Sequence, residues 1–319
     1  MLLADYFRFP RDEAWDASIS CGVRHAIVRL PETPDFDVTD ETHWHTVMDG
    51  FASLGLTPVG IEPMPNALHD HIKAGDEKRD ECIDKVIRML AVMDRYDVRL
   101  ICFNFMAHIG WLRTRADYPE RGGAFVTAFN LADFDEKAVN PDGKRITAKE
   151  LWDNYTYFVK AVVPEAKKHG IRLALHPDDP PLEHLGGVER IFINKENIRK
   201  AVYDICPSEA LGVTYCQANY HIMGEDVAAT AREWAKKIFF VHFRNTTGTP
   251  TAFRETFHDN GDLDMASLLK TYKDSGIDVP IRVDHVPTMP GESPGMPGYG
   301  ARGRYFAIGY LKGLLEAIG

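Results

Sequence analysis

The sequence predicts a single (β/α)8 barrel, the α/β fold in which eight parallel strands close into a cylinder inside a ring of helices. Short apolar runs rich in β-branched residues recur along the chain, and amphipathic stretches with helical periodicity separate them. Such alternation produces parallel sheets, and eight repeats of it favour a closed barrel over an open sheet. We therefore expect residues 1–319 to form one TIM-barrel domain with long loops after several strands.

The predicted strands are apolar on both faces, as is typical of strands that helices cover in a parallel sheet. They are residues 2–7, 25–30, 57–63, 98–105, 171–177, 210–216, 238–245 and 281–285, of which the first has the weakest pattern. A Gly-x-Gly-x-x-Gly motif follows none of them. Because that motif binds the pyrophosphate in dinucleotide-binding sheets, its absence weakens the open-sheet alternative.

Helical patterns fill the intervals between the predicted strands. Residues 76–97 repeat apolar side chains at i, i+3, i+4 and i+7 from Ile83 to Leu90, which is the spacing of an amphipathic helix. Residues 148–170 end in Lys-Lys-His-Gly, a basic last turn followed by a glycine stop. The remaining predicted helices are residues 40–56, 194–205, 225–237, 265–276 and 302–319.

Three segments fit neither pattern, and each of them follows a predicted strand. Residues 106–147, 246–264 and 286–300 are rich in Gly, Pro, Thr and Asp. Loops that follow barrel strands lie at the carboxyl ends of the strands, where barrel enzymes keep their active sites. We therefore expect these segments to form lids and substrate walls.

Composition limits the partners and the location of the chain. The formal net charge of −10 disfavours nucleic acid as a partner. The chain has no apolar run near the roughly 20 residues of a membrane span, and its first residues lack a signal-peptide pattern, so we expect no membrane partner and a cytoplasmic location. The five cysteines are an odd number without close pairs, which predicts free thiols. Four of them are expected to be small buried residues: Cys21, Cys82, Cys102 and Cys206.

Side chains that can bind a metal stand at the ends of four successive predicted strands: His176, Cys216, His242 and Asp284. Because such positions converge near the barrel axis at one end, we expect the four to lie close together. Two imidazoles, a thiolate and a carboxylate form a suitable set for a divalent transition metal. The set leaves open whether the site is closed, as in structural zinc sites, or keeps positions for a substrate.

Longer strings around these residues resemble the mannonate dehydratase family of the xylose-isomerase-like barrels. The matching segments are residues 61–75, 104–114, 176–181, 213–216, 240–245, 257–265, 283–285 and 297–314. The resemblance implies a divalent ion bound by the four residues named above, with Mn2+ as the first candidate and Fe2+, Co2+ or Zn2+ as others. It also implies elimination of water from a C6 aldonic acid, with proton transfer by the pair that matches His285 and Tyr299.

The chain departs from the family pattern near the expected substrate wall. An Arg-Trp-aromatic-Gly string is missing near residues 6–10, and residues 107–110 replace the proline and aspartate that usually precede the tryptophan. Arg115 stands where the family tends to have an aspartate. We therefore expect the metal and proton-transfer residues to follow the family and the substrate wall to differ from it.

Elimination beside a carboxylate needs a base, an acid and a cation that stabilises the developing negative charge. We assign Tyr299 as the base at C2 and His285 as the acid at the departing hydroxyl, and the reverse assignment stays open. A phenol with an ordinary pKa near 10 needs a nearby positive charge, such as the metal or Arg302, to act as a base.

Other polar residues near the strand ends are candidates for contact with the substrate. Arg113 and Arg244 could grip a carboxylate or hydroxyls, since a guanidinium matches a carboxylate as a fork. The remaining substrate-binding candidates are Asn104, His258 and Asp262. Asp178 and Asp179 are candidates for orienting the ligands, and Glu62 for contacting the substrate or an arginine.

These expectations combine into a catalytic barrel that dehydrates a sugar acid. D-mannonate is the first candidate substrate, with 2-dehydro-3-deoxy-D-gluconate and water as its products. The alternatives are a sugar isomerase or epimerase on the same barrel and a sugar-acid-binding protein without activity. Proton removal beside a bound cation serves isomerisation as well, whereas a non-catalytic protein has no need of both His285 and Tyr299. A small sugar acid is the expected partner, and a homo-oligomer is compatible with the sequence.

Overall fold

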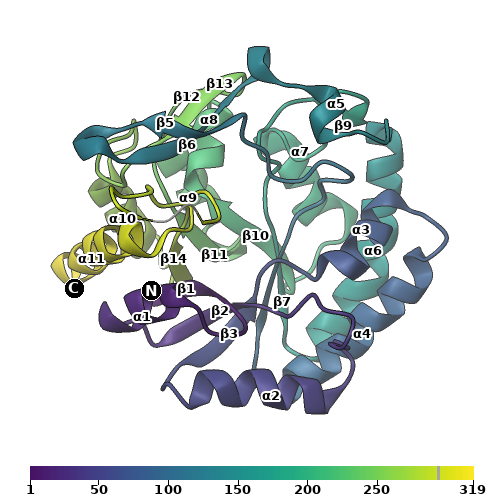
Figure 1. Cartoon of the computed structure of the whole chain (residues 1–319). Helices are drawn as coiled ribbons and strands as arrows, with labels where there is room; N and C mark the ends of the chain where they lie inside the picture. Colours follow the sequence, from purple (N-terminus) through teal and green to yellow (C-terminus); the bar gives the residue numbers. More distant parts are fainter. Residues whose placement is uncertain (293–294) are drawn as a thin grey trace.

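The computed structural model describes residues 1–292 and 295–319, and at its centre is a closed barrel of eight parallel strands (Figure 1). The strands are β1 (Leu2–Arg8), β2 (His25–Arg29), β3 (Thr57–Ile61), β4 (Leu100–Phe103), β7 (Arg172–Leu175), β10 (Leu211–Cys216), β11 (Ile238–Phe243) and β14 (Pro280–Val283). Neighbours follow the order of the chain, and β14 closes the barrel by pairing with β1. Each strand overlaps one of the predicted apolar runs, so the predicted barrel fold is confirmed.

Helices surround the barrel (Figure 1). Those that were predicted are α2 (Glu41–Ala52), α4 (Arg79–Arg95), α6 (Ala148–Lys168), α7 (Lys195–Arg199) with the π-helical turn Lys200–Ile205, α9 (Val227–Trp234) with the 3-10 turn Ala235–Lys237, α10 (Met265–Asp274) and α11 (Ala301–Ile318). Those that the sequence did not reveal are α1 (Glu13–Ser20), α3 (Asn66–Ala74), α5 (Glu136–Val139), α8 (Gln217–Ile222) and the 3-10 turns Arg121–Gly123 and Leu131–Asp133. The unpredicted α-helices have nine residues or fewer, which is too short for the helical period to stand out.

Helix α6 begins with a reciprocal cap. The Thr147 side chain accepts a hydrogen bond from the Glu150 backbone N–H, and the Glu150 carboxylate accepts one from the Thr147 backbone N–H. Further along, the helix buries Leu151, Tyr155 and Phe158 in the hydrophobic core. The cap therefore stabilises the first turn of a helix on which the core depends.

Replacing the capping threonine should destabilise the fold measurably. Thr147→Ala leaves first-turn N–H groups without this partner, and loss of such a cap typically costs about 1 kcal/mol. We expect the midpoint of urea unfolding to fall in this variant. Thr46→Ala, at an exposed position within α2, is the matched control and should leave the midpoint unchanged or slightly raised, because alanine favours helix. Equal effects of the two substitutions would contradict the role of the cap.

The interior of the barrel changes from apolar to polar toward the carboxyl ends of its strands. A small cluster that includes Ile27, Ala174 and Phe240 fills the interior. Alternate residues of a strand face the same side of a sheet. His176 therefore lies one layer beyond Ala174, and His242 one layer beyond Phe240. An apolar plug thus supports a layer of polar residues at the carboxyl ends.

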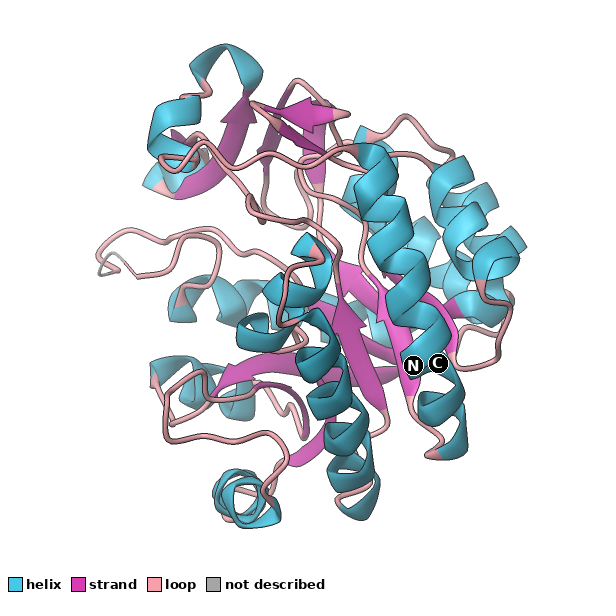
Figure 2. Ribbon diagram, turned by 90° about the vertical axis from the view of Figure 1, so that its right-hand side faces the viewer, coloured by secondary structure: helices cyan, strands magenta, loops and turns pink. Residues whose placement is uncertain are grey.

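The long loops at the carboxyl ends form a second sheet, which the sequence analysis did not predict. Its strands pair antiparallel in the order β12-β13-β6-β5, and we call it the loop sheet. They are β5 (Arg115–Pro119), β6 (Phe125–Asn130), β12 (Thr246–Thr249) and β13 (Ala252–Glu255). Figure 2 shows this sheet set apart from the barrel strands. It joins segment 106–147 to segment 246–264, and a bridge between Phe125 and Thr288 attaches segment 286–300.

Smaller features complete the fold. A two-stranded hairpin of β8 (His184–Leu185) and β9 (Val188–Glu189) follows β7. Within the described ranges, the helices are too short or too polar to cross a membrane. All five cysteines are free, as predicted. Cys82 and Cys102 are buried, but Cys21 and Cys206 are only half-buried, so the expected burial was wrong for these two.

Candidate metal centre and active site

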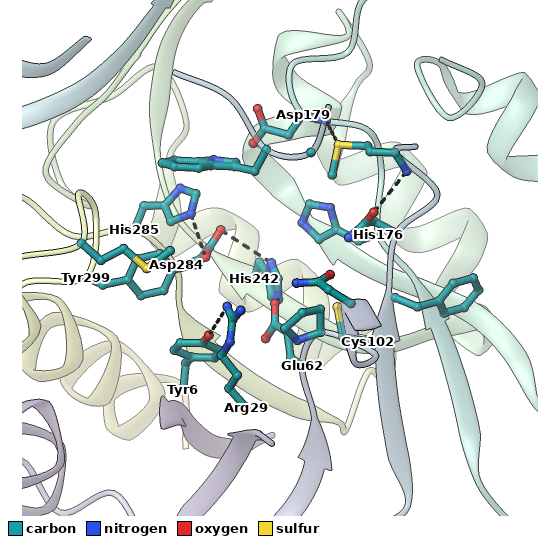
Figure 3. Close-up of a pocket in the computed structure, with 18 of the residues that line it drawn as sticks. Tyr6, Arg29, Glu62, Cys102, His176, Asp179, His242, Asp284, His285 and Tyr299 are labelled. Carbon is teal, nitrogen blue, oxygen red and sulfur yellow. Dashed lines mark hydrogen bonds and ion pairs between the residues drawn. The ribbon is translucent and has the colours of Figure 1, made fainter. Parts of the chain in front are cut away.

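A cavity of about 410 Å3 opens at the carboxyl ends of the barrel strands (Figure 3). The strands contribute residues at or just beyond their ends, among them Glu62, His176 and His242. The segments after β4 and β14 contribute Trp111 and Tyr299. The cavity is therefore bounded by the barrel and by segments 106–147 and 286–300. No residue of segment 246–264, which the structure describes throughout, lines it, so the expected wall role was wrong for that segment.

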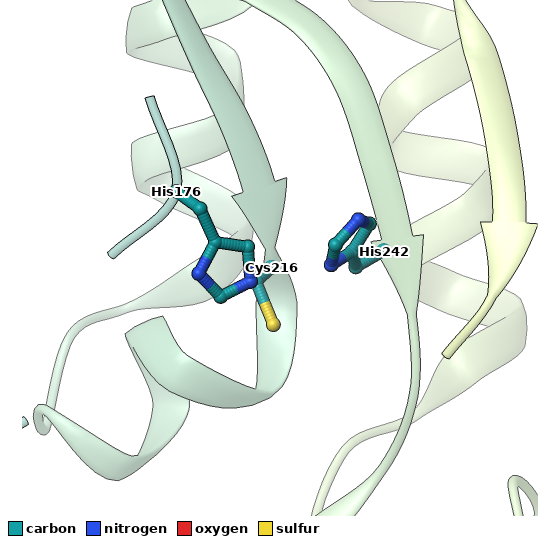
Figure 4. Close-up of side chains that lie close together, drawn as sticks. All are labelled: His176, Cys216 and His242. Atoms are coloured by element: carbon teal, nitrogen blue, oxygen red, sulfur yellow. The ribbon is translucent and has the colours of Figure 1, made fainter. Parts of the chain in front are cut away.

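Three of the predicted ligands converge beside this cavity. His176 is the first residue after β7, Cys216 ends β10, and His242 lies in β11. Cys216 and His242 stand opposite each other in the register of their strands. One potential ligand atom from each of the three lies within 4.8 Å of the others, and Figure 4 shows the three side chains gathered around one space. Since metal–ligand bonds are about 2.0–2.3 Å long, this spacing is close to that of atoms sharing one ion.

Asp284 lies beside this group. It is the first residue after β14, and its Oδ2 atom is 3.6 Å from Nδ1 of His242. Burial by itself would raise the pKa of this carboxyl, but the positive charges around it, among them Arg282 and Arg244, outweigh burial and hold the pKa well below its ordinary value. Asp284 is therefore an ionised carboxylate next to His242, although it is not part of the group of three whose ligand atoms lie within 4.8 Å of one another.

The two imidazoles are arranged as metal ligands would be. Nδ1 of His176 lies 2.6 Å from the backbone oxygen of Pro177, and donation of its proton there leaves the lone pair on Nε2. Both ring nitrogens of His242 are buried, and among the described residues neither makes a hydrogen bond. Oε1 of Glu62 lies 3.1 Å from Nε2 of His242 but without hydrogen-bond geometry. Because unpaired buried polar atoms are costly, the surroundings of His242 fit a metal ligand.

One buried ion-pair network beside the cavity contains more carboxylates than guanidinium groups. Ion pairs join the guanidinium groups of Arg113, Arg244 and Arg282 to the carboxylates of Glu62, Asp179, Glu255 and Asp284. In this network three positive charges face four negative charges, before any thiolate at Cys216 is counted. A divalent cation would offset the imbalance, so the charge of the site and its donor atoms both fit a metal.

A second group of side chains, formed by Glu62, Cys102 and His242, also has the spacing to hold an ion. Two observations weigh against it. Nε and Nη2 of Arg282 bind the Glu62 carboxylate at 2.9 and 2.8 Å. Burial raises the pKa of the Cys102 thiol well above its ordinary value, whereas a metal ligand must be a thiolate. The group that contains Cys216 is therefore the better candidate.

His285 and Tyr299, the predicted proton-transfer pair, line the cavity next to Asp284 (Figure 3). His285 has a φ of 41°, in the left-handed region that residues other than glycine rarely adopt. This turn of the backbone allows the consecutive residues Asp284 and His285 both to face the cavity. Nδ1 of His285 lies 2.6 Å from Oε1 of Glu255, and its Nε2 lies 3.6 Å from Oδ1 of Asp284. The ring of Tyr299 packs edge-on against that of His285, with centroids 5.2 Å apart.

The surroundings of Tyr299 hold its phenol in the protonated form. Burial, and then the Asp284 carboxylate, raise the pKa of this phenol well above its ordinary value. The cation that acts on it is Arg282, which lowers the pKa only in part. Arg302, the cation considered in the sequence analysis, donates instead to the backbone oxygen of Pro290 at the surface.

The residues predicted to bind substrate separate into two groups. Asn104 and Arg244 line the cavity, whereas Arg113, His258 and Asp262 do not.

The second group contacts other parts of the protein. Arg113 is bound by Asp179 at 2.6 Å. His258 is fully buried, its Nε2–H donates to the backbone oxygen of Phe243 at 2.9 Å, and its pKa is lowered by burial to about 4. Asp262 lies near the surface, 3.2 Å from His221. In this structure none of these three side chains forms the wall of the cavity.

The structure also brings in residues that the sequence analysis did not select. Arg282 binds both Glu62 and Asp284, and it stands two positions before Asp284, so strand alternation could have identified it. Nε1 of Trp111 is buried at the cavity and makes no hydrogen bond with any described residue. Glu255 reaches His285 from β13, and no sequence pattern marks that contact.

Comparisons with known proteins point to one family. The D-mannonate dehydratase (UxuA) family profile matches residues 16–143 and 140–319. The chain is 32% identical to mannonate dehydratase 2 of Halalkalibacterium halodurans over 297 residues, which cover 83% of each chain. It is 31% identical to the mannonate dehydratase of Brachyspira hyodysenteriae over 331 aligned positions, which cover 93% of this chain and 92% of the relative.

A solved structure supports the same assignment. The crystal structure of the mannonate dehydratase from Streptococcus suis serotype 2 matches all of this chain and 93% of its own, with a TM-score of 0.87 and 27% sequence identity. The family profile and the relatives extend over most of the sequence, so the similarity is not limited to the barrel fold. The chain therefore belongs to the D-mannonate dehydratase family and is a hydro-lyase.

Proposed function

We propose that this chain binds a divalent metal and converts D-mannonate into 2-dehydro-3-deoxy-D-gluconate and water, with residues 1–319 acting as one catalytic domain. One observation carries the proposal beyond family membership. Candidate metal ligands and candidate proton-transfer residues, each at or beyond the end of a barrel strand, meet around a single cavity. The cavity volume of about 410 Å3 lies within the range of small-molecule sites.

The residues that would hold the metal are His176, Cys216, His242 and Asp284. Their mixture of imidazole, thiolate and carboxylate suits a first-row transition ion. Following the family resemblance, we propose Mn2+ as the physiological ion, with Fe2+, Co2+ and Zn2+ as alternatives. When bound, the ion would supply positive charge that stabilises the negative charge developing at the substrate carboxylate as the C2 proton leaves.

The protein's own side chains move the two protons. The sequence favours Tyr299 as the base and His285 as the acid, but the contacts of the two residues support the reverse assignment. Nδ1 of His285 faces the Glu255 carboxylate, and donation of its N–H there leaves a lone pair on Nε2. We propose that Nε2 of His285 removes the C2 proton and that the hydroxyl of Tyr299 protonates the departing C3 hydroxyl.

This assignment balances without a further reactant. The C2–H and C3–O bonds break, a double bond forms between C2 and C3, and the leaving hydroxyl takes the Tyr299 proton to become water. The resulting enol tautomerises to the 2-keto-3-deoxy acid. Because the rings of His285 and Tyr299 pack 5.2 Å apart, return of the captured proton to the phenolate restores both residues.

Polar groups on the cavity wall are available to contact the substrate. Oδ1 of Asn104 accepts the backbone N–H of Met106 at 3.1 Å, which leaves its amide N–H groups for a hydroxyl. Trp111 presents an unpaired indole N–H at the cavity, as far as the described residues show. The guanidinium of Arg244 already donates hydrogen bonds to Glu255 and Asp179. We therefore propose that Arg244 acts on the substrate mainly through its positive charge. We propose Asn104 and Trp111 as donors to the substrate hydroxyls.

A product assay tests the proposed function. The purified chain incubated with D-mannonate and Mn2+ should accumulate a 2-keto-3-deoxy acid, measured by the colour reaction of such acids. Other C6 aldonates, which differ only in hydroxyl configuration, are the matched controls and should react far more slowly. An isomerase or epimerase would give a product that keeps every hydroxyl, and a binding protein would give no product. Either outcome would overturn the proposal.

A further inference from the structure

Glu255 joins the loop sheet to the candidate active site. It is the last residue of β13, outside the barrel, and its side chain is only 4% exposed. Its Oε1 atom lies 2.6 Å from Nδ1 of His285. The same oxygen accepts hydrogen bonds from Nη2 of Arg113 and from Nη1 of Arg244, each at 2.5 Å. One carboxylate oxygen thus links His285 to two arginines from separate parts of the chain.

The two arginines fix this carboxylate in place. Arg113 belongs to the segment between β4 and β5, and Arg244 follows β11. Asp179 binds both guanidinium groups, through Oδ1 to Arg113 at 2.6 Å and through Oδ2 to Arg244 at 2.7 Å. Buried, charge-assisted hydrogen bonds of this kind are strong and directional. Glu255 therefore has little freedom to move away from His285.

The contact determines which nitrogen of His285 carries the proton. A neutral imidazole has one N–H, and a carboxylate facing Nδ1 places that proton on Nδ1. The lone pair then resides on Nε2, the nitrogen 3.6 Å from Oδ1 of Asp284. Nη1 of Arg244 also lies 2.7 Å from Nδ1 and carries two protons, one of which it donates to Oε1 of Glu255. The negative charge of Glu255, 2.6 Å from Nδ1, therefore decides the position of the imidazole proton, and the contact with Arg244 does not. In the opposite tautomer, the lone pair of Nδ1 would face the negatively charged carboxylate of Glu255, and the two would repel each other.

We propose that Glu255 is a positioning residue that sets the tautomer and the direction of His285. The loop sheet thereby contributes to the reaction without touching the substrate. The inference rests on the proposed function, in which Nε2 of His285 removes the C2 proton. It assigns to the loop sheet a role beyond covering the cavity, because the barrel strands alone supply no carboxylate at Nδ1 of this histidine among the described residues.

Two substitutions separate this role from a structural one. Glu255→Met removes the charge and the acceptor, so we expect kcat for dehydration of D-mannonate to fall by about 10²-fold or more, with KM and bound metal close to their wild-type values. Glu255→Gln keeps an oxygen that can accept the Nδ1 proton, so its kcat should fall less. Glu120→Gln is the matched control, because Glu120 forms a partly buried ion pair with Arg254, a residue of the same strand as Glu255, and does not contact His285. Its kcat should be unchanged.

Nitrogen-15 NMR of the imidazole rings provides a readout that a change in stability would not produce. In the full chain loaded with diamagnetic Zn2+, the His285 signals are those missing from the His285→Asn spectrum. We expect them to show a protonated Nδ1 in the wild type and a shift toward the other tautomer in Glu255→Met. Unchanged signals together with unchanged kcat in Glu255→Met would overturn the proposal.

Two further outcomes have a clear meaning. If Glu255→Met does not fold, wild-type kcat in Glu255→Gln would overturn the positioning role. If the wild type shows a protonated Nδ1 but forms no product from D-mannonate, the proposed function is rejected while the contact between Glu255 and His285 stands. The two failures are therefore distinguishable.

Discussion

Chelation of divalent cations is expected to abolish turnover, and added Mn2+ is expected to restore it. The reason is the composition of the site: His176, Cys216 and His242 lie together with Asp284 beside His242, and the ion-pair network that includes Asp284 has more carboxylates than guanidinium groups. Cys216→Ser should lower the metal affinity as well as the activity, because a hydroxyl is a much poorer ligand than a thiolate for a transition ion. Metal content after dialysis and competition with a chelator measure the affinity independently of turnover.

Cys206→Ser is the matched control for this experiment. Cys206 is half-buried, contacts the backbone of Val159, and contributes no candidate ligand, so the same chemical change there should leave metal affinity unaltered. An experimental structure of the loaded protein should place the ligand atoms about 2.0–2.4 Å from one ion. A Cys216→Ser protein that retains stoichiometric metal with wild-type affinity would show that the thiol is not a ligand.

The second large effect is expected at the proton-transfer pair. Tyr299→Phe and His285→Asn should keep the fold and the metal but lose about 10²–10⁴-fold in kcat, as is typical when a positioned acid or base is removed. If His285 takes the C2 proton, His285→Asn should also stop exchange of the C2 hydrogen with deuterated water. Tyr299→Phe should then block product formation while permitting exchange. The opposite pattern of exchange would restore the assignment with Tyr299 as the base.

Metal content, turnover and C2 exchange should be measured on the same protein samples. Tyr305→Phe, at an exposed position of α11, controls for the loss of a phenol and should behave as the wild type. Near-normal turnover in both Tyr299→Phe and His285→Asn would exclude both residues from catalysis. It would leave the metal acting with some other base.

The barrel could be predicted from the sequence because its strands are covered on both faces. Residues 238–245 are apolar at most positions, and the longer helices between such runs repeat their apolar residues with a clear period. The loop sheet could not be predicted in the same way. All residues of β5 are exposed, and β6 pairs with β13, which lies far away in the sequence. The exposure of β5 therefore leaves no apolar run to mark it, and the partner of β6, whose inner residues are buried, cannot be read from the neighbouring sequence.

The candidate ligands could be predicted because residues at the ends of successive barrel strands lie at the same end of the barrel. A side chain at the end of one strand lies near those at the ends of its neighbours, whatever the helices between them contain. Contacts such as those of Arg113 and Glu255 follow no such rule, since they depend on how the loops pair with one another. For the same reason, the sequence placed Asp262 near the substrate, whereas the structure places it near the surface beside His221.

The pairing of β6 with β13 has a consequence for changing what the cavity accepts. Substrate walls in barrel enzymes are usually treated as separate loops that can be exchanged one at a time. Here segments 106–147 and 246–264 share one sheet, and the junction passes through hydrogen bonds between their backbones. Exchanging one segment alone would expose the edge of its partner strand and invite pairing with another chain. A transplanted segment 106–147 therefore has to bring segment 246–264 with it, although that second segment lines no part of the cavity.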